Sequence, residues 1–177
     1  MPYAPQIEHH AAGGNDVLNG LRELIHTQLE RHHNLPFLKA TMAASAVVAI
    51  ADGSIDFSQR VRVDQLLETL EALKIFDPHE GVDMFNNFAD FILEDPASGH
   101  AKAIAAITPM AENPEMAKLL VRACRAISEA NGEINLIEKI ELITLCSLLG
   151  VEPIDCGLDP DYREAIDAYA GAPSTSN

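Results

Sequence analysis

Two segments of the chain, 79 residues apart, repeat the same pattern of oxygen-bearing side chains around a glycine. The residues with carboxylate or amide oxygens in these segments are Asp52, Asp56, Gln59, Asn131, Glu133, Asn135 and Glu138. Oxygen ligands of this kind suit a hard cation such as Ca²⁺ or Mg²⁺ rather than Zn²⁺. If the two segments meet in space, they predict a weak divalent-cation site with the ligands Asp52, Asp56, Asn131, Glu133, Asn135 and Glu138.

A purely structural explanation of the same residues stays open beside the metal site. Each glycine stands where a residue with positive φ closes the preceding helix. The third residue after each glycine, and the side chain three positions further on, have the spacing of a capping box: Asp56 with Gln59, and Asn135 with Glu138. Turn chemistry explains less well the polar residue before each glycine, Asp52 and Asn131, since a carboxylate at a helix C-terminus meets the negative end of the helix dipole.

Neither segment is an EF-hand. A twelve-residue loop opened at Asp52 or Asn131 would close on Val63 or Leu142, and not on the bidentate Glu that an EF-hand requires.

Apolar residues follow a helical period along almost the whole chain, and no segment alternates long enough to predict an exposed strand. We therefore expect an all-α fold, a single compact domain of seven to eight helices with residues 16–170. Residues 1–15 are expected to be a flexible arm, and residues 171–177 a disordered tail. Because each repeated segment joins two helices, the domain is expected to be a duplicated helix pair with pseudo-twofold symmetry. The predicted helices cover about 16–33, 37–51, 57–73, 78–94, 97–110, 114–130, 136–149 and 160–170.

Several of these helices have start signals or apolar faces that predict their packing. Asp77-Pro78 and Asn113-Pro114 each place a capping residue before a proline at the first helical position. Pro36 is expected to separate the first two helices. The predicted buried face of the first helix is Leu18, Leu21, Ile25 and Leu29, and that of the helix at 136–149 is Ile137, Ile140, Ile143 and Cys146.

The composition excludes several classes of function. The 177 residues hold 12 Lys and Arg against 27 Asp and Glu, a formal net charge of −15. Such an acidic surface repels phosphate backbones and anionic lipid headgroups, so no nucleic-acid partner is expected. No signal peptide or apolar run of membrane-spanning length is visible, which favours a cytoplasmic protein that is not inserted in a membrane.

Enzymatic chemistry has little support in the sequence. The three cysteines, Cys124, Cys146 and Cys156, form no CxxC pair, and the first two fall on or beside apolar helix faces. There is no GxSxG, no phosphate-binding glycine loop and no GxGxxG. We expect no enzyme, no catalytic residues and no cofactor other than the Ca²⁺ or Mg²⁺ considered above.

Two Glu-x-x-His pairs on the first helix have the spacing of di-iron ligands in helical bundles: Glu23 with His26, and Glu30 with His33. A di-iron site needs such pairs to project inward from different helices. Here both lie on one helix, on the flank away from its apolar face, so we interpret them as a solvated stripe.

The repeated segments resemble the signature of the bacterial tellurite-resistance TerB-like family, Ala-Asp-Gly-x-Ile/Val-x-x-x-Glu, which occurs twice in an all-helical domain. This chain has Ala-Asp-Gly-Ser-Ile at residues 51–55 with Gln59, and Ala-Asn-Gly-Glu-Ile at 130–134 with Glu138. The resemblance covers about residues 37–153. It departs from the signature at Gln59 and Asn131, so each half has one carboxylate fewer than the family pattern.

The resemblance implies a non-enzymatic, cytoplasmic protein linked to tellurite resistance and chemical stress, which binds metal and works with a membrane-protein complex. We accordingly expect a helical scaffold or adaptor with a weak divalent-cation site. The alternative is a pure protein-interaction module in which both turns are structural and no metal binds. A protein partner is expected in both cases, and a homodimer is a further alternative.

Overall fold

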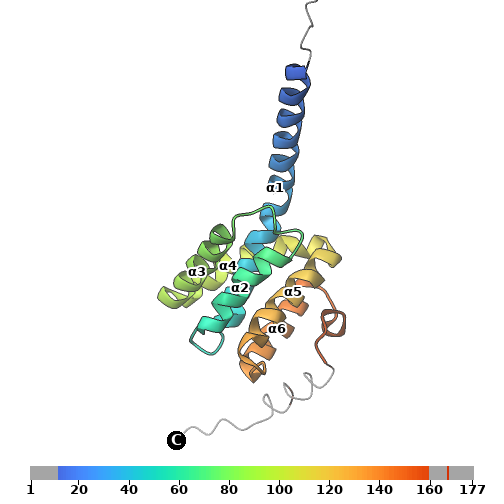
Figure 1. The fold of residues 1–177 in the computed structure, drawn as a ribbon. Helices are drawn as coiled ribbons and strands as arrows, with labels where there is room; N and C mark the ends of the chain where they lie inside the picture. Colours follow the sequence, from blue (N-terminus) through green and yellow to red (C-terminus); the bar gives the residue numbers. More distant parts are fainter. Residues whose placement is uncertain (1–11, 160–166, 168–177) are drawn as a thin grey trace, which may run out of the picture.

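A single long helix forms the centre of the molecule and also extends out of it (Figure 1). The computed structural model describes residues 12–159 and residue 167 of the chain. Within them, α1 runs over Ala12–Ile50, a length of 39 residues. Its second half passes through the body, where every residue from Ala40 to Ile50 is buried. Its first half projects away from the body into solvent.

The prediction of two separate helices at 16–33 and 37–51 is wrong, because α1 continues through Pro36. Proline in a helix interior has no N–H to donate and crowds the preceding turn, which costs about 3 kcal/mol in an isolated helix. The burial of Phe37 and Leu38, directly after Pro36, supplies packing energy that offsets this cost. Asp16, expected to cap the first helix, lies inside α1 instead.

The other helices begin within one residue of the predicted positions. They are α2 (Phe57–Thr69), α3 (Pro78–Glu94), α4 (Pro96–Ile107), α5 (Pro114–Ser128) and α6 (Leu136–Leu149). Asp77, Asp95 and Asn113 each accept a hydrogen bond from a backbone N–H in the first turn of the helix that follows. Three short 3-10 helices, η1 (Thr108–Glu112), η2 (Glu129–Asn131) and η3 (Pro153–Cys156), complete the elements.

The described residues thus form an all-α fold with six α-helices and no strand, fewer than the seven to eight helices expected. The merging of the first two helices accounts for part of the difference. The predicted helix at 160–170 and the tail at 171–177 lie outside the described residues, except for residue 167. Most of the expected N-terminal arm also lies outside them, but α1 already begins at Ala12.

The helices surround the buried half of α1. In Figure 1, α3 and α4 lie on one side of it and α5 and α6 on the other, while α2 bridges α3 and α5. Helices α3 and α4 approach closely because Gly99 faces the backbone of Ile92. A Cβ at position 99 would lie 2.5 Å from the Ile92 Cα, closer than real Cβ contacts allow.

Of the two apolar faces that the sequence predicts to be buried, the one on the first helix is exposed and the one on α6 is buried only in part, at Cys146. Leu18, Leu21, Ile25 and Leu29 lie on the projecting half of α1 and are 52–64% exposed. On α6, Ile137 is 44% exposed, and the buried face consists of Leu142, Leu145, Cys146 and Leu149 together with Glu138. Helix α6 is apolar on more than one side, so its periodicity alone does not select the face that packs inward.

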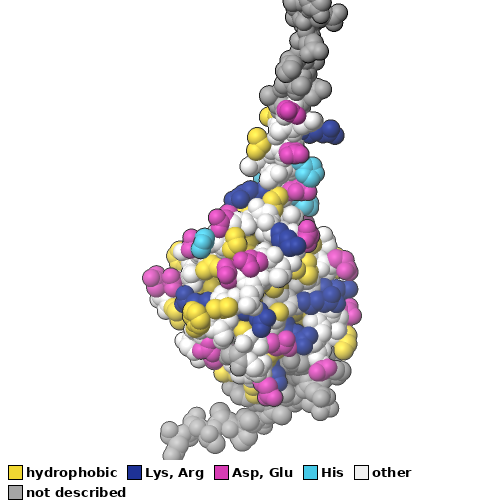
Figure 2. All heavy atoms as spheres, in the orientation of Figure 1, with side chains coloured by type: hydrophobic (Ala, Val, Ile, Leu, Met, Phe, Trp, Pro, Cys, Tyr) yellow, Lys and Arg dark blue, Asp and Glu magenta, His cyan; other side chains and the backbone are white. Residues whose placement is uncertain are grey.

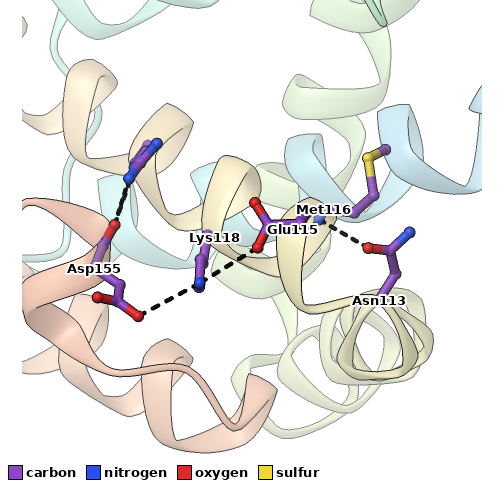
Figure 3. A network of polar contacts seen from close by, with 6 residues as sticks. Asn113, Glu115, Met116, Lys118 and Asp155 are labelled. Atoms are coloured by element: carbon purple, nitrogen blue, oxygen red, sulfur yellow. Dashed lines mark hydrogen bonds and ion pairs between the residues drawn. The ribbon is translucent and has the colours of Figure 1, made fainter.

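The segment after α6 is held against α5 by a small polar network (Figure 3). Lys118 on α5 lies 3.4 Å from Glu115 and 3.4 Å from Asp155 of η3. Arg122, one turn further along α5, donates to the backbone carbonyl of Asp155 at 2.6 Å. The two carboxylates raise the pKa of Lys118. The network fixes η3 so that Cys156 and Leu158 can close the core.

In the part of the chain that the structure covers, no helix combines the length and the apolar character needed to cross a membrane.

Candidate functional site

The two repeated segments form two similar turns, each between the end of one helix and the start of another. The first follows α1 and carries Gly53 at a φ of +90°; the second follows η2 and carries Gly132 at a φ of +119°. A side chain with a Cβ rarely adopts such positive φ values, which explains the glycine in each turn.

Both predicted capping boxes are present. At the start of α2, the backbone N–H of Asp56 donates to the Oε1 atom of Gln59 at 3.0 Å. At the start of α6, the N–H of Asn135 donates to Oε2 of Glu138 at 3.1 Å, and the N–H of Glu138 donates to Oδ1 of Asn135 at 2.9 Å. Each cap places its glutamine or glutamate side chain back over the start of the helix, and therefore toward the other turn.

The two turns meet in the interior. Nε2 of Gln59 donates to Oε1 of Glu138 at 2.9 Å, and these residues are only 3% and 1% exposed. A second contact lies at the surface, where Nδ2 of Asn135 donates to Oδ2 of Asp52 at 3.2 Å. We call these four residues the junction. The expectation that the turns converge is therefore confirmed for Asp52, Asn135 and Glu138.

A second buried pair lies between α1 and α5. The Oγ atom of Ser45 is 3.6 Å from the Sγ atom of Cys124, and both residues are fully buried. The sequence separation of this pair is 79 residues, the same as for Gln59 and Glu138. Two contacting pairs of buried residues therefore share the spacing of the repeated segments.

Burial dominates the electrostatics of the junction. The pKa of Glu138 is raised, mainly because its carboxylate is removed from water, and the negative charges of Asp52 and Asp56 raise it further. The hydrogen bonds from the Asn135 backbone and the Gln59 amide act in the opposite direction. The junction thus concentrates negative charge from both turns around one buried carboxylate, and amide donors partly balance it.

The junction's carboxylate oxygens already have protein donors. Gln59 and the Asn135 backbone each bind one oxygen of Glu138, and Asp52 accepts from Ser54 and from Asn135. A cation would have to share or displace these donors. The buried Glu138 is held firmly, whereas the exposed Asp52 and Asn135 can turn toward an ion at the surface. Glu138 is therefore available to a cation only if its hydrogen bonds to Gln59 and to the Asn135 backbone are broken.

The remaining predicted ligands are less closely placed. Asp56 is exposed at the start of α2, and Glu133 is exposed beside a shallow hollow that Glu129 and Lys139 also line. Asn131 ends η2, and its side chain lies outside what the structure describes. Among the described residues, no group of three or more His, Cys, Asp and Glu side chains is close enough to hold a metal ion.

The hydrogen bond between Gln59 and Glu138 is a feature that sequence reasoning missed. The sequence indicates two separate caps, and each cap explains its own turn without a partner. The equal spacing of 79 residues was the available signal, because equivalent positions lie near a twofold axis if the two halves are related by one.

Other candidate groups are placed as expected. Cys124, Cys146 and Cys156 are all buried and free. Burial raises the pKa of Cys124 and of Cys146 to about 12. Glu23, His26, Glu30 and His33 are exposed on α1, where His26 lies 3.5 Å from Glu30.

An apolar groove of about 640 Å³ lies where α1 enters the body, between α3 and α4. Its lining includes Leu35, Met84, Phe88, Phe91 and two lysines, Lys39 and Lys102. The ammonium of Lys102 lies 3.6 Å from the centre of the Phe91 ring, a cation–π contact. The groove therefore combines an apolar floor with positive charge on a protein that is otherwise strongly acidic.

The fold and the junction define a class of all-helical protein in which two glycine turns are joined across the interior. The family model described as tellurite resistance protein TerB matches residues 38–158, and the chain belongs to this family. A relative from Alcaligenes sp., named tellurium resistance protein TerB, is 28% identical over 111 residues, which cover 62% of this chain and 91% of the relative. No solved structure matches the chain. Membership of the TerB family supports a function related to tellurite resistance.

Proposed function

We propose that this chain is a non-enzymatic, cytoplasmic scaffold or adaptor that acts in resistance to tellurite and related chemical stress. The observation that carries the proposal is the buried hydrogen bond between Gln59 and Glu138. It ties the start of α2 to the start of α6, which supports the proposal that the body acts as one rigid unit. A rigid body with an extended helix and an apolar groove is suited to presenting surfaces to partners.

The reactive groups of the body support a role without catalysis. A thiol with a pKa near 12 is almost never a thiolate at neutral pH, so Cys124 and Cys146 are poor nucleophiles. The carboxylate of Glu138 is held from both sides by its hydrogen bonds and has no access to a substrate.

The groove supports a partner of definite chemistry. Its apolar floor and the lysines 39 and 102 suit an amphipathic helix that has acidic residues beside its apolar face. A cytoplasmic helix of a membrane-protein complex could supply such a segment without insertion of this chain into the bilayer.

Tellurite resistance in a strain that lacks its own copy of the protein tests this function. We expect the wild-type chain to restore growth on tellurite, and Lys39→Glu/Lys102→Glu to fail while its melting temperature stays unchanged. Lys74→Glu is the matched control, because Lys74 is exposed and pairs with Glu71 away from the groove. Full resistance in the groove variant would remove the groove from the proposal, and no resistance from the wild type would remove the function.

A weak Ca²⁺ or Mg²⁺ site at the rim of the junction is the second candidate. The observation that favours it is the concentration of negative charge, since Asp52 and Asp56 both raise the pKa of the buried Glu138. A divalent cation near Asp52, Asp56 and Asn135 would relieve this repulsion. The amide donors of Gln59 and Asn135 already relieve part of this repulsion. We therefore favour a hydrogen-bonded junction without metal.

Calorimetric titration and melting curves distinguish a cation site at the rim from a metal-free junction. A rim site with a Kd of about 1 mM would add about 1.4 kcal/mol to the free energy of unfolding in 10 mM Ca²⁺. The gain should disappear in Asp52→Asn and in excess chelator. A melting temperature that does not change with Ca²⁺, Mg²⁺ or chelator would support the metal-free junction and exclude the cation site.

A further inference from the structure

The first part of α1 carries an apolar face that the rest of the described chain leaves uncovered. We call residues 12–30 the stalk, because Arg31 is the first residue tied to the body, by a 2.6 Å ion pair with Glu80 and a contact with the Phe76 ring. Figure 2 shows apolar side chains exposed along the stalk. They are Leu18, Leu21, Leu24, Ile25 and Leu29, each more than half exposed.

Four of these residues form one stripe along the helix. At 100° per residue, Leu18, Leu21, Ile25 and Leu29 fall within about 80° of one another, and Leu24 lies at the edge. The carboxylates of the stalk, Asp16, Glu23 and Glu30, fall on the opposite side by the same geometry. The stripe is therefore an apolar face without negative charge on a chain whose net charge is −15.

We propose that the stripe is a dimer interface, which packs against the stripe of a second copy of this chain in antiparallel orientation. A Leu or Ile side chain at this exposure has on the order of 100 Å² left to bury, so the ten side chains of a pair supply about 1,000 Å². This is the area at which specific association between proteins begins.

The spacing of the stripe and the charge of the body favour the antiparallel orientation. Positions 18 and 29, and positions 21 and 25, lie nearly symmetrically about residue 23, so Leu18 faces Leu29 and Leu21 faces Ile25 of the other copy. The stalk has three carboxylates and one arginine, a net charge of −2, which leaves −13 on the rest of the chain. Antiparallel stalks that pair about residue 23 hold these acidic bodies at opposite ends, about 24 Å apart along the helix and beyond the screening length.

The stalk lies outside the TerB match, which begins at residue 38. A dimer through the stalk therefore leaves the junction and most of the body unchanged, and its failure in a test would not bear on the proposed function.

Sedimentation equilibrium of the full chain tests the interface. The wild type is expected at about twice the chain mass of 19.2 kDa at 100 µM. Leu21→Glu/Ile25→Glu should weaken association at least 100-fold. Asn19→Glu/Thr27→Glu adds the same charge on the opposite side and should remain a dimer. The proposal would be overturned by a monomeric wild type, by a Leu21→Glu/Ile25→Glu protein that dimerises as well as the wild type, or by equal loss of dimer in both variants.

Disulfide formation tests the orientation, since the three native cysteines are buried. Leu18→Cys and Leu29→Cys proteins are oxidised separately and as a mixture. We expect a cross-linked dimer in the mixture and none in either protein alone. Cross-linking of each protein with itself would show parallel stalks and overturn the antiparallel arrangement.

Discussion

The side chains of Gln59 and Glu138 form a hydrogen bond in which only the Gln59 amide can donate and only the Glu138 carboxylate can accept. Gln59 uses Oε1 to accept from the Asp56 N–H and Nε2 to donate to Glu138. Glu138 uses its second oxygen to accept from the Asn135 N–H. One amide and one carboxylate therefore satisfy two helix starts and each other, and two amides or two carboxylates could not.

Glu138→Gln should lower the free energy of unfolding by about 1–3 kcal/mol. If the new amide accepts from the Asn135 N–H, its NH₂ group faces the NH₂ group of Gln59, and one buried donor loses its partner. Chemical denaturation at pH 7, with circular dichroism at 222 nm, measures the change. A variant as stable as the wild type would mean that the junction tolerates two facing amides.

Gln59→Glu should cost more, about 3–5 kcal/mol at pH 7, because two buried carboxylates then face each other. Acidification below pH 5 should recover part of the loss, because one added proton can be shared between the carboxylates. The same denaturation experiment, repeated from pH 4 to pH 8, gives the pH dependence. A loss that does not depend on pH would point to steric strain.

The exchange Gln59→Glu/Glu138→Gln should restore most of the stability, to within about 1 kcal/mol of the wild type. The amide and the carboxylate trade places, so every donor again meets an acceptor. A double-mutant cycle with the two single variants measures the coupling. Additive losses in the double variant would show that the two side chains act independently.

The raised pKa of Glu138 makes its contribution to stability depend on pH. Because the folded state holds this proton more tightly than the unfolded state, the contribution is complete below the ordinary glutamate pKa and is lost as the pH rises through the folded value. A ¹³C NMR titration of the Glu138 carboxyl should give a midpoint above the ordinary value. A midpoint at or below it would mean that the hydrogen bonds outweigh burial.

The three thiols should resist alkylation in the folded protein. Cys124, Cys146 and Cys156 are buried, and burial raises the pKa of all three. Iodoacetamide at pH 8 should modify them only as fast as the protein unfolds, and within minutes in 6 M guanidinium chloride. Rapid modification of a cysteine without denaturant, located by mass spectrometry, would contradict the packing around that residue.

Gly99→Ala should destabilise the body by about 1–3 kcal/mol, because its Cβ would meet the Ile92 backbone, which cannot move aside as a side chain can. Gly20→Ala is the matched control. Gly20 lies on the stalk with nothing near the new Cβ, so this change should stabilise α1 by about 0.5–1 kcal/mol. Thermal melts of both variants give the comparison, and opposite signs are the expected result.

The elements with local signals could be predicted from the sequence, since a cap and its helix are neighbours in the chain. Asp77-Pro78 and Asn113-Pro114 start helices as expected, and both capping boxes form. The continuation of α1 through Pro36 could not be predicted, because the energy that sustains it comes from helices far along the sequence.

In the candidate site, too, the features set by neighbouring residues could be predicted and those set by packing between helices could not. The caps at Asp56 and Asn135 depend on residues three positions away and follow from spacing. The hydrogen bond between Gln59 and Glu138 depends on how α2 and α6 pack, which no local pattern specifies. On the stalk, the periodicity of the leucines correctly predicts an apolar face, but it does not predict what that face contacts.

Because α1 is one helix from the stalk into the core, the number of residues in the stalk sets the angle at which the body is held. Deleting one residue would turn the body by about 100° about the helix axis, whereas deleting seven would shorten the rod by about 10 Å and nearly restore the angle. The number of residues in this helix therefore determines how the body is oriented in any assembly that forms through the stalk.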